Sequence, residues 1–408
     1  MGESPAGWPE SPATLEAHDL DRLFSSLRTL GYTVIGPRVR DGALVYDELD
    51  GAAALPAGWA DEQAPGHYRL RRTGDDRLFG ITHGATGWKR WLHPPVVRLW
   101  RAERTEGGLR FTDAEPPPPP MAFVGVRACE LAAIGVQDRV LLDPPQSDAV
   151  YQARREPVFL VAVQCARASG TCFCASMGTG PRSRAGFDLA LTEVLEDGRH
   201  WFRVEVGTRR GADVLQLVPH QAATPREIDV AERTLAEVPQ QMGRSLATDG
   251  LADRLAASYE RPHWQTLEAR CLACGNCTLA CPTCFCVTAD DAAALAGNTS
   301  DRVRRWDTCF SADFSYIHGG SVRSSIQARY RQWLTHKLST WHTQFGTSGC
   351  VGCGRCITWC PVGIDITQEA PAAAEAPATG RAHAPRSSTN HPSQPRVARS
   401  APAAPRLE

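Results

Sequence analysis

The chain has 408 residues, enough for two or three domains of ordinary size. Its 44 lysines and arginines nearly balance its 45 aspartates and glutamates, so bulk charge selects neither nucleic acid nor an anionic membrane as a partner. Because the opening residues carry no export or lipidation signal and the most apolar short stretch (158–165) is far below the roughly 18 residues of a membrane span, we expect a cytoplasmic protein without membrane contact.

The first predicted unit, residues 1–115, mixes helix and strand. Leucines at helical spacing predict a helix over 20–30, closed by Gly31, and the next residues read as a strand. The aromatic, basic and proline-containing segment 87–95 is interpreted as a surface or interface loop. The run Pro116–Pro120 predicts a stiff polyproline spacer, so we place a domain boundary near residue 116.

The second predicted unit, residues 116–225, has a βαβ rhythm. A strand over 121–126, a helix over 128–142 and a second buried strand ending at Cys165 predict parallel strands joined by a crossover helix. Cys129 and Cys165 then fall at the carboxyl ends of parallel strands, where open α/β sheets bind ligands. The two strands expected after them, near 187–206, alternate apolar with polar residues and predict one face open to water.

The third predicted unit, residues 226–367, is expected to be helical, including a long amphipathic helix over 322–341. The remainder, 368–408, is rich in Ala, Pro, Ser and Arg and predicts a disordered tail. The sequence therefore predicts an α+β protein: a mixed α/β N-terminal region, a helical two-cluster ferredoxin-like module, and the tail.

Fifteen cysteines dominate the chemistry of the chain. Without a secretion signal, a disulfide framework is a poor explanation, and metal binding or redox chemistry is the better one. Eleven of the fifteen lie between Cys271 and Cys360. No catalytic triad or paired-carboxylate pattern stands out, so we predict no catalytic residues.

Two cysteine runs share one spacing. "CLACGNCTLACP" and "CVGCGRCITWCP" both read C-x2-C-x2-C-x3-C-P, the spacing of bacterial [4Fe-4S] ferredoxins. The fourth cysteine of such a run ligates the other cluster in two-cluster ferredoxins, which predicts a crossed assignment. Zinc also binds four thiolates, but it rarely uses two identical runs of this kind. One predicted cluster takes Cys271, Cys274, Cys277 and Cys360; the other takes Cys281, Cys350, Cys353 and Cys356.

Seven cysteines remain, including those of two TCFC strings at 171–174 and 283–286. Cys129, Cys165, Cys172 and Cys174 form a complete set that could hold a third iron-sulfur cluster. Cys284, Cys286 and Cys309 are only three and could simply line the ferredoxin module. Other hypotheses are one cluster shared between the two TCFC strings, redox-active thiols, lining of a flavin pocket, and buried cysteines that serve only packing.

The order of "GVRACELAAI", "CARASGTCFCASMGTGP", "CLACGNCTLACPTCFC" and "CVGCGRCITWCPVGIDI" resembles the iron-sulfur beta subunit of cytoplasmic nickel-iron hydrogenases of the sulfhydrogenase type. It is also similar to the A subunit of anaerobic sulfite reductase, and the resemblance covers roughly residues 20–367. The long interval between the two cysteine runs belongs to it, whereas the tail does not.

The resemblance implies an electron-transfer subunit whose partners are the hydrogenase small and large subunits and a flavin subunit that reacts with NAD(P)H. FAD is then expected on that partner rather than on this chain. The alternative is a subunit of a sulfite or sulfur reductase in which the α/β domain contacts a substrate or a flavin. An iron-sulfur redox sensor lacks support because no basic DNA-binding helix is evident.

Overall fold

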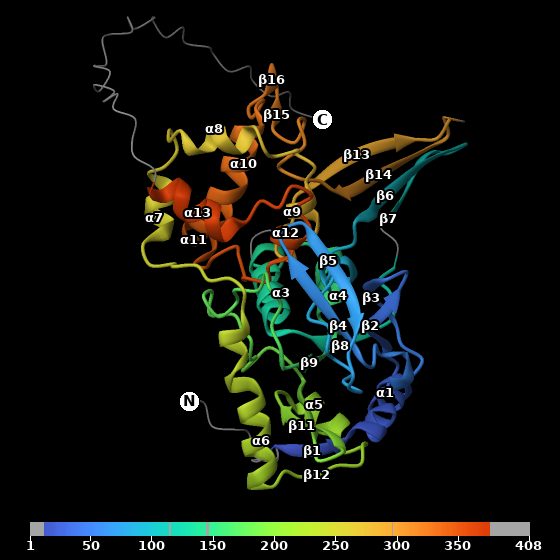
Figure 1. Cartoon of the computed structure of the whole chain (residues 1–408). Helices are drawn as coiled ribbons and strands as arrows, with labels where there is room; N and C mark the ends of the chain where they lie inside the picture. Colours follow the sequence, from blue (N-terminus) through green and yellow to red (C-terminus); the bar gives the residue numbers. More distant parts are fainter. Residues whose placement is uncertain (1–11, 114–115, 144–146, 296, 376–408) are drawn as a thin grey trace, which may run out of the picture.

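A computed structural model describes residues 12–113, 116–143, 147–295 and 297–375. Figure 1 shows three regions: a large sheet with its helices, a group of helices at the upper left, and a narrow sheet that projects to the upper right. The predicted mixture of helix and strand is confirmed. The predicted tail beyond residue 375 lies outside the described residues.

The large sheet has eight strands in the order β12-β1-β11-β10-β9-β8-β2-β3. Its centre is parallel, since β10 pairs with β9, β9 with β8 and β8 with β2, whereas the outer pairs are antiparallel. Strands from both sides of residue 116 share this sheet; the domain boundaries stay a prediction. The strands are β1 Ala13–Glu16, β2 Thr33–Arg40, β3 Ala43–Glu48, β8 Met121–Val126, β9 Phe159–Val163, β10 Leu189–Glu196, β11 Arg199–Val206 and β12 Gln221–Ala222.

Helices cover both faces of the large sheet. On one face α1 (Leu20–Thr29) and α5 (Arg209–Leu215) pack against the central strands, and on the other α3 (Ala128–Leu141) and α4 (Ala149–Arg155) do so. Every residue of β8 is buried, as expected for a parallel strand between two helical layers. The predicted βαβ unit of β8, α3 and β9 is therefore confirmed.

The predicted open face of β10 and β11 is wrong. Helix α6 (Pro225–Ala236) covers it, and Val230 and Ala231 of this helix pack on Val194 and Trp201. The polar residues that suggested solvent are paired instead; Arg203, for example, donates a 2.6 Å hydrogen bond to Glu232 of α6. The alternation of apolar and polar residues distinguished the two faces of these strands correctly. The helix that covers the polar face comes later in the chain, so the strands themselves give no sign of it.

The narrow sheet joins segments far apart in the sequence. Its antiparallel order is β13-β14-β6-β7, with β6 Val96–Thr105, β7 Gly108–Asp113, β13 Val287–Ala293 and β14 Thr299–Trp306. The expectation that the interval between the two cysteine runs is helical is thus wrong for residues 287–306. Their polar sequence has little intrinsic preference for strand, and β14 forms its backbone hydrogen bonds by pairing with β6.

The segment predicted as a surface or interface loop is an internal interface. Helix α2 (Lys89–Leu92) lies within it, and Trp88, Lys89 and Leu92 are buried. The Lys89 ammonium lies 3.9 Å from the centre of the Trp306 ring and donates hydrogen bonds to the carbonyls of Leu279 and Cys284. Two short hairpins complete the strands: β4 Trp59–Ala64 with β5 His67–Arg72, and β15 Tyr316–Ile317 with β16 Gly320–Ser321.

The helical module consists of α7 to α13 and their loops. The helices are α7 Leu251–Ala256, α8 His263–Glu268, α9 Asn276–Leu279, α10 Ile326–Thr335, α11 Trp341–Phe345, α12 Arg355–Thr358 and α13 Ile366–Glu375. A π-helical turn, His336–Thr340, joins α10 to α11, so the long helix predicted over 322–341 is present with shifted ends. The predicted start of the tail at 368 is wrong, because Ala370, Ala373 and Ala374 of α13 are buried in the module core. Ala-rich composition suggested disorder, yet small side chains let this helix pack closely.

In the part of the chain that the structure describes, no helix is both long and apolar enough to cross a membrane.

Candidate iron-sulfur centres

The two cysteine runs fold into the same local structure. Each forms a tight loop that leads into a helix of one turn, α9 or α12. Gly275 and Gly354 precede these helices with φ of +75° and +76°, a conformation that costs glycine little. Ala273 and Gly352, at equivalent places in the two runs, also have positive φ. The repeated spacing therefore encodes a repeated backbone that turns successive thiols toward one centre.

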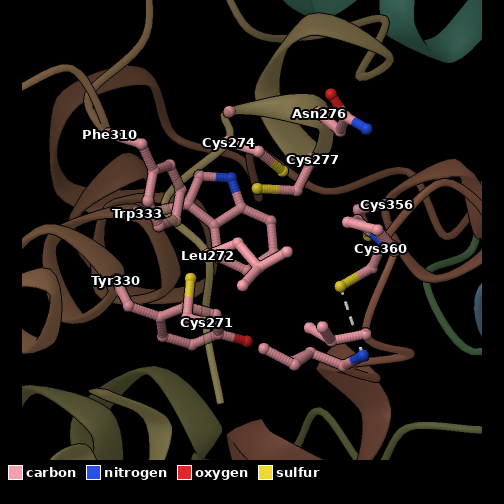
Figure 2. A pocket seen from close by; sticks show the side chains of 14 residues that line it. Cys271, Leu272, Cys274, Asn276, Cys277, Phe310, Tyr330, Trp333, Cys356 and Cys360 are labelled. Atoms are coloured by element: carbon pink, nitrogen blue, oxygen red, sulfur yellow. Dashed lines mark hydrogen bonds between the residues drawn. The ribbon is translucent and has the colours of Figure 1, made fainter. Parts of the chain in front are cut away.

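Group one consists of Cys271, Cys274, Cys277 and Cys360. Figure 2 shows these side chains around one cavity, which has about 410 Å³ of empty space, part of it open to solvent. Cys360 comes from the end of the second run, as the crossed arrangement requires. The pKa of Cys277 is raised well above its ordinary value by burial and then by the thiols of Cys271, Cys360 and Cys274, which places the four together.

Group two consists of Cys281, Cys350, Cys353 and Cys356. Burial raises the pKa of Cys356 well above its ordinary value, and the nearby thiols of Cys350, Cys353 and Cys281 raise it further. Cys281 ends the first run, so a thiol of the first run lies near the three of the second run. Cys356 also lines the cavity of group one, so groups one and two are neighbours.

Backbone amides point at the sulfur atoms of both runs. The N–H of Ala273 donates to Cys271 Sγ over 3.4 Å, and the N–H of Gly352 donates to Cys350 Sγ over the same distance. Ile364 donates to Cys360 Sγ over 3.3 Å, the bond drawn in Figure 2. Such bonds stabilise thiolate and, in iron-sulfur proteins, tune the reduction potential.

The donor set fits a cluster better than a single ion. Among the residues described, no three Cys, His, Asp or Glu side chains converge closely enough to hold one metal ion. Zinc needs its four thiolates about 2.3 Å from one centre, whereas a cubane has an iron at each corner and spaces its ligands more widely. Tyr330 Oη and Trp333 Nε1, whose side chains line the group one cavity, are buried polar atoms without a hydrogen-bond partner among the described residues. A cluster in this cavity would offer them sulfur acceptors.

Group three consists of Cys129, Cys165, Cys172 and Cys174. All four line a single cavity with about 330 Å³ of empty space, part of it open to solvent, together with His83, Arg127 and Arg167. They come from the start of α3, the end of β9 and the first TCFC string, so the predicted set is brought together. Burial is the largest cause that raises the pKa of each of these thiols, and it brings that of Cys172 to about 12.

The first TCFC string packs directly on the second cysteine run. Phe173 N–H donates a 2.9 Å hydrogen bond to the Gly352 carbonyl, and a Cβ on Gly352 would lie 2.6 Å from the Phe173 carbonyl oxygen. Cys129, Cys174 and Cys353 share one buried cluster. Group three therefore adjoins group two, and the three groups form a continuous series.

The second TCFC string lies elsewhere. Cys284 and Cys286 line a different cavity, together with Cys309, and that cavity shares no lining residue with the one of group three. The hypothesis that the two TCFC strings share one cluster is therefore not supported by this arrangement.

Charged residues that the sequence analysis did not identify hold the groups in place. Arg355, next to Cys356, is fully buried and donates 2.5 Å and 2.9 Å hydrogen bonds to Glu130 of α3 and to the Gly84 carbonyl. Lys337, only 3% exposed, donates to Cys281 Sγ over 3.3 Å. Burial lowers the pKa of Lys337, but the thiols of Cys281, Cys284 and Cys350 outweigh it and raise the pKa well above its ordinary value. A lysine or arginine inside a helical pattern carries no signal of its own, so only the fold reveals these roles.

Comparison with known proteins gives two matches. A 4Fe-4S dicluster domain matches residues 270–364. The chain is 33% identical over 246 residues to "Sulfhydrogenase 2 subunit beta" of Pyrococcus furiosus, a match that covers 59% of this chain and 70% of that protein. No solved structure matches the chain.

Proposed function

This chain belongs to the family of sulfhydrogenase beta subunits and is an iron-sulfur electron-transfer subunit, and we propose that it carries electrons between a flavin subunit that reacts with NAD(P)H and a nickel-iron hydrogenase core. The observation that carries this proposal is the uninterrupted series of three cysteine groups, which runs from the large sheet into the helical module. A [4Fe-4S] cluster, when bound, accepts and releases one electron at a time.

We propose the ligands group by group. Cys360 lines one cavity with the first three cysteines of the first run, and the Cys281 thiol lies near those of the second run; both placements support one [4Fe-4S] cluster in group one and another in group two. The shared cavity of group three supports a third cluster there. FAD and the nickel-iron centre are assigned to partner subunits.

The two ends of the series differ in exposure, which suggests where electrons enter and leave. In group one Cys274 is exposed, and the neighbouring Leu272 has 61% of its surface accessible. An exposed apolar side chain beside the cysteines suits a partner that must approach closely. The cysteines of groups two and three are more deeply buried than those of group one.

The ligand assignment is tested on anaerobically purified protein by its iron and acid-labile sulfide content and by electron paramagnetic resonance of the reduced sample. We expect at least about twelve irons, because each [4Fe-4S] cluster holds four. Cys271→Ala and Cys165→Ala should each remove about four irons, from different groups, and so serve as controls for one another. Zinc in place of iron, or an unchanged iron content in both variants, would contradict the assignment.

The relay is tested in the assembled complex. With Cys271→Ala, hydrogen-dependent reduction of an artificial dye at the nickel-iron core should persist, while hydrogen-dependent reduction of NAD(P)⁺ should fall at least tenfold. Unchanged NAD(P)⁺ reduction would refute the relay. Reduction of sulfite by the isolated chain with an artificial electron donor would favour the reductase alternative instead.

A further inference from the structure

Three cysteines stand outside the three groups. Cys284, Cys286 and Cys309 line one hollow of the helical module, with about 970 Å³ of empty space that is partly open to solvent. Aromatic side chains form much of its wall, and Arg323 and Lys337 are the cationic residues that line it. We call these three cysteines group four.

The hairpin β13–β14 brings group four together. Val287, the first residue of β13, pairs with Trp306, the last residue of β14, so the residues just outside the hairpin also meet. Asp307 N–H donates a 2.9 Å hydrogen bond to the Cys286 carbonyl. Cys286 and Cys309 therefore line the same hollow. Cys284, two residues before Cys286, faces the same hollow.

A buried ammonium closes the floor of the hollow. Lys337 Nζ donates to Cys284 Sγ over 3.5 Å, to Cys281 Sγ over 3.3 Å, and to two oxygen atoms, those of the Thr283 hydroxyl and the Gly349 carbonyl. These acceptors include no carboxylate. A buried cation is costly without polar partners, and the sulfur of Cys284, which lines the hollow, is one of the atoms that Lys337 contacts.

Two further features favour a ligand in this hollow. Lys337 lies in the π-helical turn His336–Thr340, and π-turns inserted in α-helices occur often at functional sites. Trp341, which lines the hollow, has a buried indole N–H group without an acceptor among the described residues. Sulfide is an acceptor that an iron-sulfur cluster would supply.

We propose that Cys284, Cys286 and Cys309 hold a further [4Fe-4S] cluster, in which one iron faces the hollow and takes a ligand other than cysteine. With this site, every cysteine of the chain belongs to one of four groups. The proposed function relates to this inference only through the neighbouring groups, since the hollow lies beside group two. A cluster in group four would place an iron that can bind an external ligand next to the electron-transfer series.

The test compares the full chain with a triple variant in which Cys284, Cys286 and Cys309 are all serine. Iron, acid-labile sulfide and native mass spectrometry should show about four irons and four sulfides fewer in the variant. Mössbauer spectra of the ⁵⁷Fe-labelled wild type should show an iron with a non-thiolate ligand that the triple variant lacks. The variant Cys271→Ala should keep that spectral component while losing group one iron.

Each outcome decides one question. Equal iron content in the wild type and the triple variant overturns group four, even if Cys271→Ala loses iron and so supports the proposed function. A wild type without iron overturns the proposed function and this inference together. If the triple variant does not fold, Cys309→Ser alone and the Mössbauer spectrum of the wild type replace it, and a wild-type spectrum with four-thiolate clusters only overturns the proposal.

Discussion

The clearest prediction concerns Lys337, whose ammonium lies 3.3 Å from the sulfur of Cys281. Replacing it by methionine keeps an unbranched side chain of most of its length and removes the positive charge. Because that charge stabilises the reduced, more negative form of a cluster in group two, its loss should lower the reduction potential. With an effective dielectric constant of about 20 and about 6 Å from the ammonium to the added electron, Coulomb's law gives about 3 kcal/mol. For one electron this equals about 130 mV.

We expect a measured decrease of about 100 mV in Lys337→Met, since water and neighbouring dipoles compensate part of the lost charge. The assay is a redox titration followed by electron paramagnetic resonance, in which group one serves as an internal reference. Arg331→Met is the matched control, because Arg331 lies on the preceding helix, α10, and its contacts are with Tyr259. A Lys337→Met variant that keeps its iron and its wild-type potentials would refute the electrostatic argument.

Three further predictions concern the packing around the groups. Gly352→Ala should destabilise the fold by more than the about 1–2 kcal/mol of left-handed strain, because its Cβ would clash with the first TCFC string. Gly346→Ala is the control, because Gly346 has a similar φ but open space around it, so this variant should cost only the strain. Guanidinium unfolding under anaerobic conditions compares the free energies of unfolding of the two variants. Equal losses of stability would contradict the clash. Glu130→Gln leaves the buried Arg355 without its carboxylate partner and should lower the free energy of unfolding by about 3–5 kcal/mol in the same assay. A loss of stability below about 1 kcal/mol would contradict a buried ion pair. Tyr330→Phe should lower the potential of group one by about 20–60 mV, the equivalent of one hydrogen bond, and leave group two unchanged; an equal shift in both would point to a general structural effect.

The local chemistry of the site could be predicted from the sequence alone. The spacing of the two cysteine runs fixes short loops and one-turn helices, because three closely spaced thiols and the residues with positive φ leave the backbone few alternatives. That spacing also predicts the crossed exchange of Cys281 and Cys360. The βαβ signal placed Cys129 and Cys165 at carboxyl ends of parallel strands, so their meeting with the first TCFC string was foreseeable.

Contacts between distant segments were decided only by the tertiary structure. The polar residues 287–306 become strands because β6, nearly two hundred positions earlier, offers an edge for pairing. Likewise α13 forms because its alanines meet the core of the helical module, and Lys337 becomes part of the site because the π-helical turn directs it at Cys281. Local spacing determines which atoms can bind iron. Which charges and strands surround those atoms depends on long-range packing, which leaves no periodic trace in the sequence.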